Sequence, residues 1–279
     1  MTELQAVREF HYTRADFERI RRLLYQRAGI SLADSKEQMV YSRLSRRLRH
    51  LGLSGFADYF EALERDPQEW QQFVNALTTN LTAFFRENHH FEQLAAYLRQ
   101  HAQTRRTLRI WCAASSTGEE PYSLAIACLE TLSDWQPPVS IIASDIDTGV
   151  LATASQGIYP LERVEQLSLQ RKQRFFLRGK GGQAGKVKVR DELRELIEFR
   201  QINLLDPHWG IAGGLDIIFC RNVMIYFDKP TQNRLLERMV ALLRPEGLFF
   251  AGHSESFIQA GHLVTLIGRT VYRPTPRRA

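Results

Sequence analysis

The segment Trp111–Ser123, WCAASSTGEEPYS, joins a loop of small residues to two glutamates and the start of a helix. The preceding run TLRIWC (107–112) has the length and the branched and aromatic content of a buried strand. The following run PYSLAIACLETL (121–132) places Leu124 and Cys128 at helical spacing. A strand, a loop and a helix in this order predict an α/β fold, and the loop is the first place to look for a ligand.

The chain continues this alternation of strands and helices to its end. Further strand-like runs lie at 139–144, 195–202, 215–220, 247–253, 263–268 and 270–274, and helical patterns begin near Asp147 and Pro230. The alternation predicts a parallel sheet with helices on both faces, and the last two runs predict an antiparallel hairpin at its edge. The run RFFLRGKGGQAGKVKVR (174–190) interrupts the rhythm and predicts an inserted β-hairpin with a Gly-rich turn.

The first hundred residues predict consecutive helices instead. Thr13 is a candidate N-cap of the first helix. The clearest start is DPQE (66–69), where Asp66 is the expected cap, Pro67 the first helical residue and Glu69 the acidic partner of a capping box. The sequence therefore predicts a helical domain followed by an α/β domain.

The composition excludes several classes of protein. The 279 residues contain no apolar run near the roughly 18 to 20 residues that cross a bilayer, and the start does not resemble a signal peptide. An intracellular protein is therefore expected. Three cysteines without CxxC spacing and eight histidines without ligand spacing predict reduced core thiols and no metal. The net charge of +6 indicates an acidic partner of unspecified class.

Two glutamates follow the small residues of the loop 113–118. At a helix N-terminus, Glu119 and Glu120 repel phosphate and favour a ligand with cationic or hydroxyl groups. The alternative is that the two glutamates bind no ligand and are ordinary first-turn acids that the helix dipole stabilises. The loop holds a single glycine, so it is not the GxGxxG of a dinucleotide site.

Polar residues also follow the other predicted strands. Asp145, in ASDID, is placed to accept hydrogen bonds from ribose hydroxyls, although a helix cap is the alternative and suits Asp147 better. Asn203 and Asn222 follow two further strands and would lie beside the same crevice. Arg86, next to two phenylalanines, is either a carboxylate-binding residue or a surface arginine.

Five segments, taken together, resemble the chemotaxis receptor methyltransferases of the CheR type. They are NLTAFFRE (80–87), STGEEPYS (116–123), ASDID (143–147), FCRNVMIYF (219–227) and GLFFAGHSESF (247–257). The resemblance implies an all-α N-terminal domain at 1–82 and a Rossmann-like, class I S-adenosylmethionine-dependent methyltransferase domain at 83–279. It also implies a small antiparallel β-subdomain inserted at about 162–192.

The same resemblance implies the reaction and the site. The methyl group of S-adenosylmethionine would pass to glutamates on the cytoplasmic helices of chemoreceptors, leaving S-adenosylhomocysteine. Arg86 and Tyr226 would be catalytic. The residues implied to contact the cofactor are Asn80, Thr82, Arg86, Glu120, Asp145, Asn203, Leu204, Asn222 and Val223.

The resemblance further implies a cytoplasmic monomer recruited to membrane-bound receptors. At about 100° per residue, a basic ridge forms along one face of the second helix, and it consists of Lys36, Arg43, Arg46 and Arg47. It would dock on an acidic receptor helix, although a solvated charge run is the alternative. The β-subdomain would bind a C-terminal receptor tether by strand addition or serve as a plain structural hairpin.

Two rival functions are considered. A nucleic-acid methyltransferase fits the basic charge, but the chain has no [ND]PPY strand end and no RNA-binding pattern of interleaved aromatics. A cofactor-binding adaptor without turnover is disfavoured by the intact NLTAFFRE and RNVMIYF segments. One departure from most S-adenosylmethionine enzymes is that AASSTG (113–118) lacks GxGxG.

Overall fold

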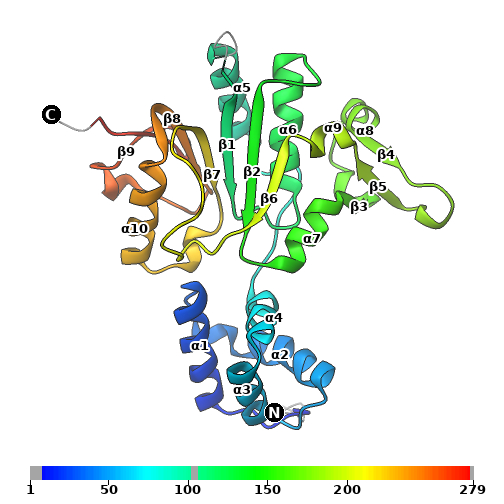
Figure 1. Cartoon of the computed structure of the whole chain (residues 1–279), viewed down its shortest axis with the longest axis vertical. Helices are drawn as coiled ribbons and strands as arrows, with labels where there is room; N and C mark the ends of the chain where they lie inside the picture. The colour runs from blue at the N-terminus through cyan, green and yellow to red at the C-terminus, as the bar shows by residue number, and fades with distance from the viewer. Residues whose placement is uncertain (1–7, 102–105, 277–279) are drawn as a thin grey trace, which may run out of the picture. The chain divides into compact units, whose positions relative to one another are not determined.

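The computed structural model describes residues 8–101 and 106–276. The chain divides into two compact units (Figure 1): a helical unit of residues 1–79 with 226–228, and an α/β unit of residues 80–225 with 229–279. The division falls just before the predicted boundary at 83.

Four α-helices lie in the described part of the helical unit, as predicted. They are α1 Arg14–Ala28, α2 Glu37–Leu51, α3 Phe56–Arg65 and α4 Pro67–Leu77, with a short 3-10 turn η1 Asp34–Lys36 before α2. Thr13 caps α1 and forms a capping box with Asp16. Asp66 caps α4 and Pro67 is its first residue, which confirms the predicted start.

The predicted capping-box role of Glu69 is wrong. Its carboxylate is buried and accepts hydrogen bonds from Arg47 Nε (3.1 Å) and the Tyr59 hydroxyl (2.9 Å). A long-range arginine partner outcompetes the local backbone N–H because a buried carboxylate requires a compensating charge. Glu69 therefore ties α4 to α2 and α3.

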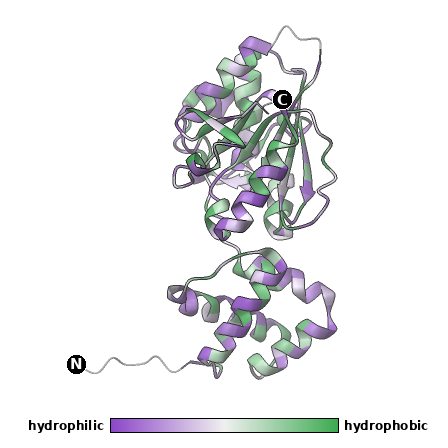
Figure 2. Ribbon diagram, turned by 90° about the vertical axis from the view of Figure 1, so that its left-hand side faces the viewer, coloured by the Kyte–Doolittle hydropathy of each residue, from purple (hydrophilic) through white to green (hydrophobic). Residues whose placement is uncertain are grey.

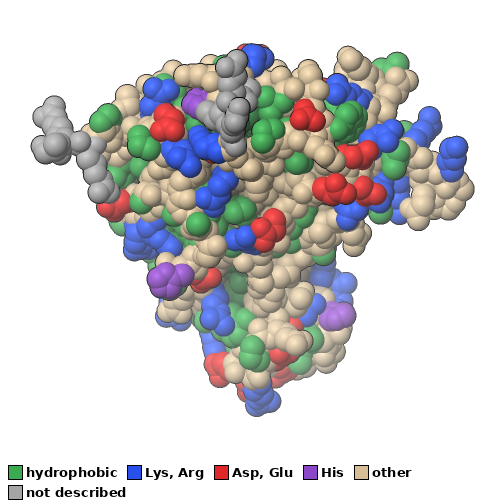
Figure 3. Space-filling model, turned by 45° about the horizontal axis from the view of Figure 1, so that its top comes forward, with side chains coloured by type: hydrophobic (Ala, Val, Ile, Leu, Met, Phe, Trp, Pro, Cys, Tyr) green, Lys and Arg blue, Asp and Glu red, His purple; other side chains and the backbone are tan. Residues whose placement is uncertain are grey.

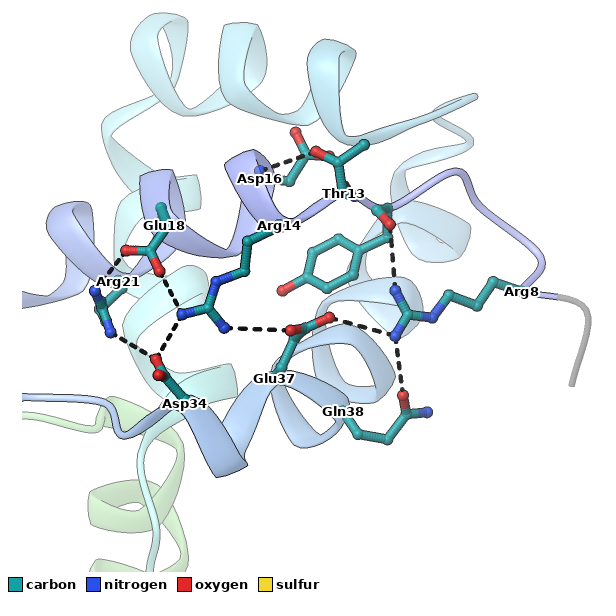
Figure 4. A network of polar contacts seen from close by, with 10 residues as sticks. Arg8, Thr13, Arg14, Asp16, Glu18, Arg21, Asp34, Glu37 and Gln38 are labelled. Atoms are coloured by element: carbon teal, nitrogen blue, oxygen red, sulfur yellow. Dashed lines mark hydrogen bonds and ion pairs between the residues drawn. The ribbon is translucent and has the colours of Figure 1, made fainter. Parts of the chain in front are cut away.

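Two arginines of α1 are also paired (Figure 4). Arg14 and Arg21 both contact Asp34 at 2.6 and 2.9 Å, and Arg14 also pairs with Glu18 at 2.7 Å. Hydrogen bonds from Arg14 hold the pKa of the Asp34 carboxyl below its usual range. Arg14 and Arg21 are thus paired within the helical unit.

A seven-stranded sheet forms the centre of the α/β unit, in the order β6-β2-β1-β7-β8-β10-β9. Its strands are β1 Leu108–Ala113, β2 Val139–Asp145, β6 Ile197–Gln201, β7 Leu215–Cys220, β8 Leu243–Ala251, β9 Val264–Gly268 and β10 Val271–Pro274. The first five strands of that order are parallel to one another. β10 pairs antiparallel with both β8 and β9, and the β9–β10 pair confirms the predicted edge hairpin.

Helices cover both faces of this sheet. They are α5 His89–His101, α6 Glu119–Leu132, α7 Thr148–Gln156 and α10 Lys229–Val240. Ile110 and Cys112 of β1 share a core with α5 and α6. On the opposite face, the ring centroids of Trp111 and Trp209 are 5.0 Å apart, and the guanidinium of Arg238 in α10 lies over the Trp209 ring. In Figure 2 the helices carry both hydrophilic and hydrophobic residues, as amphipathic helices do.

A second sheet, with the order β3-β5-β4, forms the inserted β-subdomain. Its strands are β3 Ile158–Pro160, β4 Phe176–Arg178 and β5 Lys186–Val189, so the predicted hairpin is confirmed. Short helical segments surround them: η2 Leu161–Val164, α8 Leu169–Phe175, η3 Gly181–Gln183 and α9 Asp191–Arg194. The subdomain begins at β3, before residue 162, where the sequence predicted its start. The prediction missed β3 because a strand of three residues is too short to produce a pattern in the sequence.

The surface of the molecule mixes charges of both signs. Figure 3 shows basic and acidic side chains interspersed on the face that it presents. Among the described helices, none is both long enough and apolar enough to cross a membrane. The three cysteines are buried free thiols.

Candidate cofactor site

The loop between β1 and α6 is held against the end of β2. The N–H groups of Ala114 and Ser115 both donate to the Ser144 carbonyl at 2.8 Å. Ala114, Ser116 and Gly118 have positive φ angles of 91°, 49° and 99°. The backbone therefore turns tightly beside the carboxyl end of β2, which is the edge where α/β sheets bind ligands.

Asp145 lies at the end of β2 and braces this loop. Its two carboxylate oxygens accept the N–H groups of Ser116 at 2.9 Å and Asp147 at 3.0 Å. The side chain is only 8% exposed, and burial raises the pKa of Asp145 to about 6. A carboxylate with spare lone pairs at this place is suited to accept ribose hydroxyls.

Asp147 is the helix cap, as the sequence indicated. Its Oδ1 accepts the N–H groups of Gly149 and Val150, and its Oδ2 accepts Asn80 Nδ2 at 2.9 Å. The Asn80 carbonyl in turn accepts the Ser116 hydroxyl at 3.1 Å. The segment that begins at Asn80 is thus bonded to both the loop and the end of β2.

The two glutamates of α6 have different partners. Glu119 is buried, accepts the Thr117 hydroxyl and lies 3.5 Å from Arg163. Glu120 accepts Arg221 Nη1 at 2.7 Å and the Cys112 thiol at 3.3 Å. Glu119 is therefore a structural first-turn acid, whereas Glu120 lies beside the β1 end with its charge compensated by a buried arginine.

Arg221 also fixes the segment around Arg86. Its fully buried side chain donates through Nη2 to the Arg86 carbonyl at 2.6 Å and lies 3.3 Å from Glu87. The Arg86 side chain donates to the Leu81 carbonyl at 2.9 Å. Sequence reasoning overlooked Arg221, because an arginine after a strand gives no sign of its burial or of its distant partners.

Asn203 and Leu204 follow β6, the neighbour of β2. Asn203 Oδ1 accepts the N–H of Leu205 at 3.0 Å, which closes a turn. The Leu204 side chain is buried, and its carbonyl accepts Trp209 Nε1 at 3.1 Å and Arg238 Nη1 at 3.2 Å. Since β6, β2 and β1 are parallel neighbours, this turn lies at the same sheet edge as Asp145.

Asn222 and Val223 follow β7, on the other side of β1, and both are half-buried. Asn222 has a φ of 58° and donates its N–H to Glu255 at 3.0 Å. Glu255 also accepts the N–H groups of Gly252 (2.6 Å) and Met224 (2.7 Å). Glu255 therefore holds the ends of β7 and β8 together, and no local pattern in the sequence predicts this role.

The remaining predicted residues have other surroundings. Thr82 lies in the segment after Asn80, where its carbonyl accepts Arg163. Tyr226 belongs to η4 Met224–Tyr226 and is grouped with the helical unit, where its carbonyl accepts the Ser31 N–H at 2.8 Å. A place for Tyr226 beside the methyl group therefore stays a prediction.

Two of the four residues in the predicted basic ridge are bonded to other residues of the helical unit. Arg43 donates to the Ala76 and Thr78 carbonyls, and Arg47 pairs with the buried Glu69. The other two members, Lys36 and Arg46, are exposed, and Lys36 lies in η1, just before α2, rather than in the helix as predicted.

One group of side chains bears on the prediction that no metal is bound. Within the described ranges, ligand atoms of Glu87, His89 and His90 lie within 4.8 Å of one another. Burial, together with Arg221, lowers the pKa of His90 to about 3. The Arg221 guanidinium already provides a positive charge beside Glu87, so we assign no cation there.

The donor set of this edge fits S-adenosylmethionine. That cofactor carries a sulfonium, an ammonium and a ribose but no phosphate. The loop 113–118 has no basic side chain, and the carboxylates of Glu120 in α6 and Asp145 at the end of β2 lie next to it, which is unsuitable for a pyrophosphate. Asn80 adds an amide group that donates to Asp147, two residues after Asp145.

Comparisons with known proteins agree with this assignment. Residues 80–273 match the family described as CheR methyltransferase, SAM binding domain, and residues 15–78 match CheR methyltransferase, all-alpha domain. The chain is 68% identical to chemotaxis protein methyltransferase 2 of Pseudomonas aeruginosa, with 95% of each chain covered. It is 52% identical to the chemotaxis protein methyltransferase of Salmonella typhimurium (96% of this chain, 93% of the relative) and 51% identical to that of Escherichia coli (98% and 93%). The chain therefore belongs to the CheR family and is an S-adenosylmethionine-dependent methyltransferase of chemotaxis.

Proposed function

We propose that the enzyme esterifies glutamate side chains of chemoreceptors, producing glutamate methyl esters and S-adenosylhomocysteine. The observation that carries the proposal is the acid-lined edge formed by Glu120 and Asp145, which suits this methyl donor, in a chain of the CheR family. The class of methyl acceptor follows from the family, whose relatives are named chemotaxis protein methyltransferases.

The acceptor needs no general base. A glutamate with an ordinary pKa of about 4.3 is already an anion at neutral pH. When bound, S-adenosylmethionine supplies an electrophilic sulfonium methyl group. The protein must then align the carboxylate oxygen with the methyl carbon and sulfur and keep water from the nucleophile. Asp145 and the loop 114–118 serve this end by fixing the orientation of the donor.

Arg86 and Tyr226 are the proposed catalytic residues. One guanidinium nitrogen of Arg86 donates to the Leu81 carbonyl, and its other donors have no partner among the described residues. They are available to hold a carboxylate, either that of the substrate or that of the cofactor. Tyr226 is proposed to orient the attacking group. Unchanged turnover in Arg86→Ala would remove Arg86 from this role.

The helical unit is the proposed docking surface for an acidic receptor helix. Because Arg43 and Arg47 have structural partners, Lys36 and Arg46 carry the free positive charge of the ridge. Lys36→Glu combined with Arg46→Glu should slow receptor methylation, most strongly at low salt, and leave S-adenosylhomocysteine binding unchanged. An unaltered rate at low salt would contradict the docking role.

β3 and β4 are the two edge strands of the β-subdomain sheet. A C-terminal receptor peptide that adds a strand there would tether a cytoplasmic, monomeric enzyme to its membrane-bound substrate. Titration of the protein with receptor C-terminal peptides tests this part, and the absence of binding would leave the hairpin a structural element.

The central experiment uses S-adenosylmethionine labelled at the methyl group. We incubate the purified protein with receptor-containing membranes, treat the product with mild alkali and count the volatile methanol released. Alkali-labile label on the receptor is expected for a carboxyl methyl ester. Label that survives alkali, or that appears on nucleic acid, would refute the glutamate assignment while leaving the cofactor assignment intact.

A further inference from the structure

The β-subdomain reaches the cofactor loop through one side chain. Tyr159, in β3, is 2% exposed and donates its hydroxyl to the Thr117 carbonyl at 2.7 Å. Gly118 follows with a φ of 99°, and a Cβ placed on it would lie 2.7 Å from the Tyr159 hydroxyl. The hydroxyl therefore fixes the loop where its backbone turns into α6, and it fills the space beside that turn.

The subdomain also supports the other cofactor segment, NLTAFFRE. The Phe84 ring packs edge-on against Tyr159 and Phe176 with centroid separations of 5.3 and 5.4 Å. Arg163, in η2, donates to the Thr82 carbonyl at 3.3 Å and lies 3.5 Å from Glu119. Two of the segments assigned to the cofactor, the loop 114–118 and NLTAFFRE, thus rest on side chains of the inserted subdomain.

We propose that Tyr159 is a positioning residue for cofactor binding, acting through the Thr117 carbonyl, and that the β-subdomain is part of the cofactor site as well as a candidate tether site. The proposal rests on the assignment of the loop 114–118 to the cofactor.

The Tyr159 hydroxyl fixes the direction of one peptide group in the loop. The Thr117 carbonyl lies between two residues with positive φ, Ser116 and Gly118, and this sequence of turns is rarely adopted without support. Without the Tyr159 donor, only the bond from the Gly118 N–H to the Ser115 carbonyl (3.0 Å) holds the peptide between residues 117 and 118, and this peptide rotates more easily. Rotation would disturb the neighbouring Ser116 N–H, which donates to Asp145. Asp145 would then lose part of the geometry that suits a ribose.

A nearby tyrosine provides a matched control. Tyr122 is fully buried in the same cluster, with its ring 6.2 Å from that of Tyr159, and its hydroxyl donates to the Ala154 carbonyl at 2.7 Å. Tyr159→Phe and Tyr122→Phe each remove one buried hydroxyl donor and keep the ring. The two variants should lose similar stability, but only the first loses a bond to the cofactor loop.

The experiment measures S-adenosylhomocysteine affinity by calorimetry, together with KM and kcat and the melting temperature, for wild type and both variants. We expect Tyr159→Phe to raise Kd and the KM for S-adenosylmethionine by roughly two- to tenfold, the range of one net hydrogen bond. Tyr122→Phe should leave both within about twofold of wild type. Equal affinities in the two variants would overturn the proposal.

A second variant guards against a folding defect. Arg163 is 44% exposed, so Arg163→Met should fold and still remove the bond to Thr82. It should also raise Kd, and an unchanged Kd would count against subdomain support of the site. Absence of S-adenosylhomocysteine binding by the wild type would instead refute the cofactor assignment itself.

Discussion

Replacing Asp145 by asparagine should have opposite effects on stability and on cofactor binding. The carboxylate is nine-tenths buried, and its pKa rises from 3.8 to about 6 because burial disfavours the charged form. The folded protein therefore binds the proton more tightly than the unfolded chain does. The stability that this proton contributes is fully present below about pH 4 and is lost as pH rises through about 6.

The size of the stability effect follows from the shift. A difference of about 2 pKa units corresponds to about 3 kcal/mol, all of it lost above pH 6. Asparagine cannot ionise, so the free energy of unfolding of Asp145→Asn, relative to wild type, should increase by about 3 kcal/mol between pH 4 and pH 7. In the variant, the NH2 group of the amide replaces one accepting oxygen and faces the N–H donor of Ser116 or Asp147. The cost of this unfavourable contact does not depend on pH. Urea unfolding at several pH values measures the difference.

Cofactor binding should respond in the other direction. The ionised carboxylate accepts ribose hydroxyls more strongly than the neutral acid or an amide, by about 1.5 to 3 kcal/mol for a charged hydrogen bond. Calorimetry should show wild-type affinity for S-adenosylhomocysteine falling below pH 6, and an affinity of Asp145→Asn that is about 10- to 100-fold weaker at pH 7 and flat with pH. Equal affinity in the variant at pH 7 would refute the role of Asp145.

Asp216 supplies the control, because it is a buried acid at the opposite end of β7. Burial opposes its ionisation, but hydrogen bonds from Arg106 and the Arg109 N–H together hold the pKa of Asp216 below its usual range. Its contribution to stability is present above the unfolded pKa and is lost as pH falls. Asp216→Asn should therefore destabilise most at neutral pH and leave cofactor affinity unchanged.

Three further substitutions test the supports of the site and of the helical unit. Glu255→Gln should weaken S-adenosylhomocysteine binding about tenfold, because an amide cannot accept all the N–H groups that hold Asn222, and calorimetry measures the change. Gly252→Ala should also weaken it, since the added Cβ would lie 2.4 Å from Asn222 Nδ2, and a wild-type affinity would contradict this contact. Glu69→Ala should lower the free energy of unfolding by about 3 kcal/mol, because Arg47 loses its buried partner; chemical denaturation checks this value.

The sequence predicts well what depends on local pattern and on strand ends. Asp145, Asn203 and Asn222 were selected because each follows a predicted strand, and parallel neighbours bring such positions to one edge. Asp147 was correctly distinguished as the cap, because a cap bonds to N–H groups only two and three residues ahead. Each of these inferences needs only short-range information.

The residues that were overlooked are those whose partners are distant in the chain. Arg221 bonds to Glu120 across 101 positions, and Tyr159 bonds to Thr117 across 42. Glu69 was assigned to its helix N-terminus because its partner Arg47 lies in another helix. A sequence pattern indicates the residue type and the element, but it does not give the burial that decides which partner a charged group takes.

The missing glycines of the loop have a physical explanation. In a GxGxG loop, alternate glycines permit positive φ, and here the alternate residues Ala114, Ser116 and Gly118 all have it. A left-handed conformation costs a residue with a Cβ about 1 to 2 kcal/mol. Hydrogen bonds offset that cost, since Ala114 donates to Ser144, and Ser116 donates its N–H to Asp145 and its hydroxyl to the Asn80 carbonyl. The loop thus reaches the conformation that glycines would allow by bonding to two of the residues assigned to the cofactor. The side chain of Asp145 and the backbone carbonyl of Asn80 therefore hold the loop at the edge where the cofactor is proposed to bind.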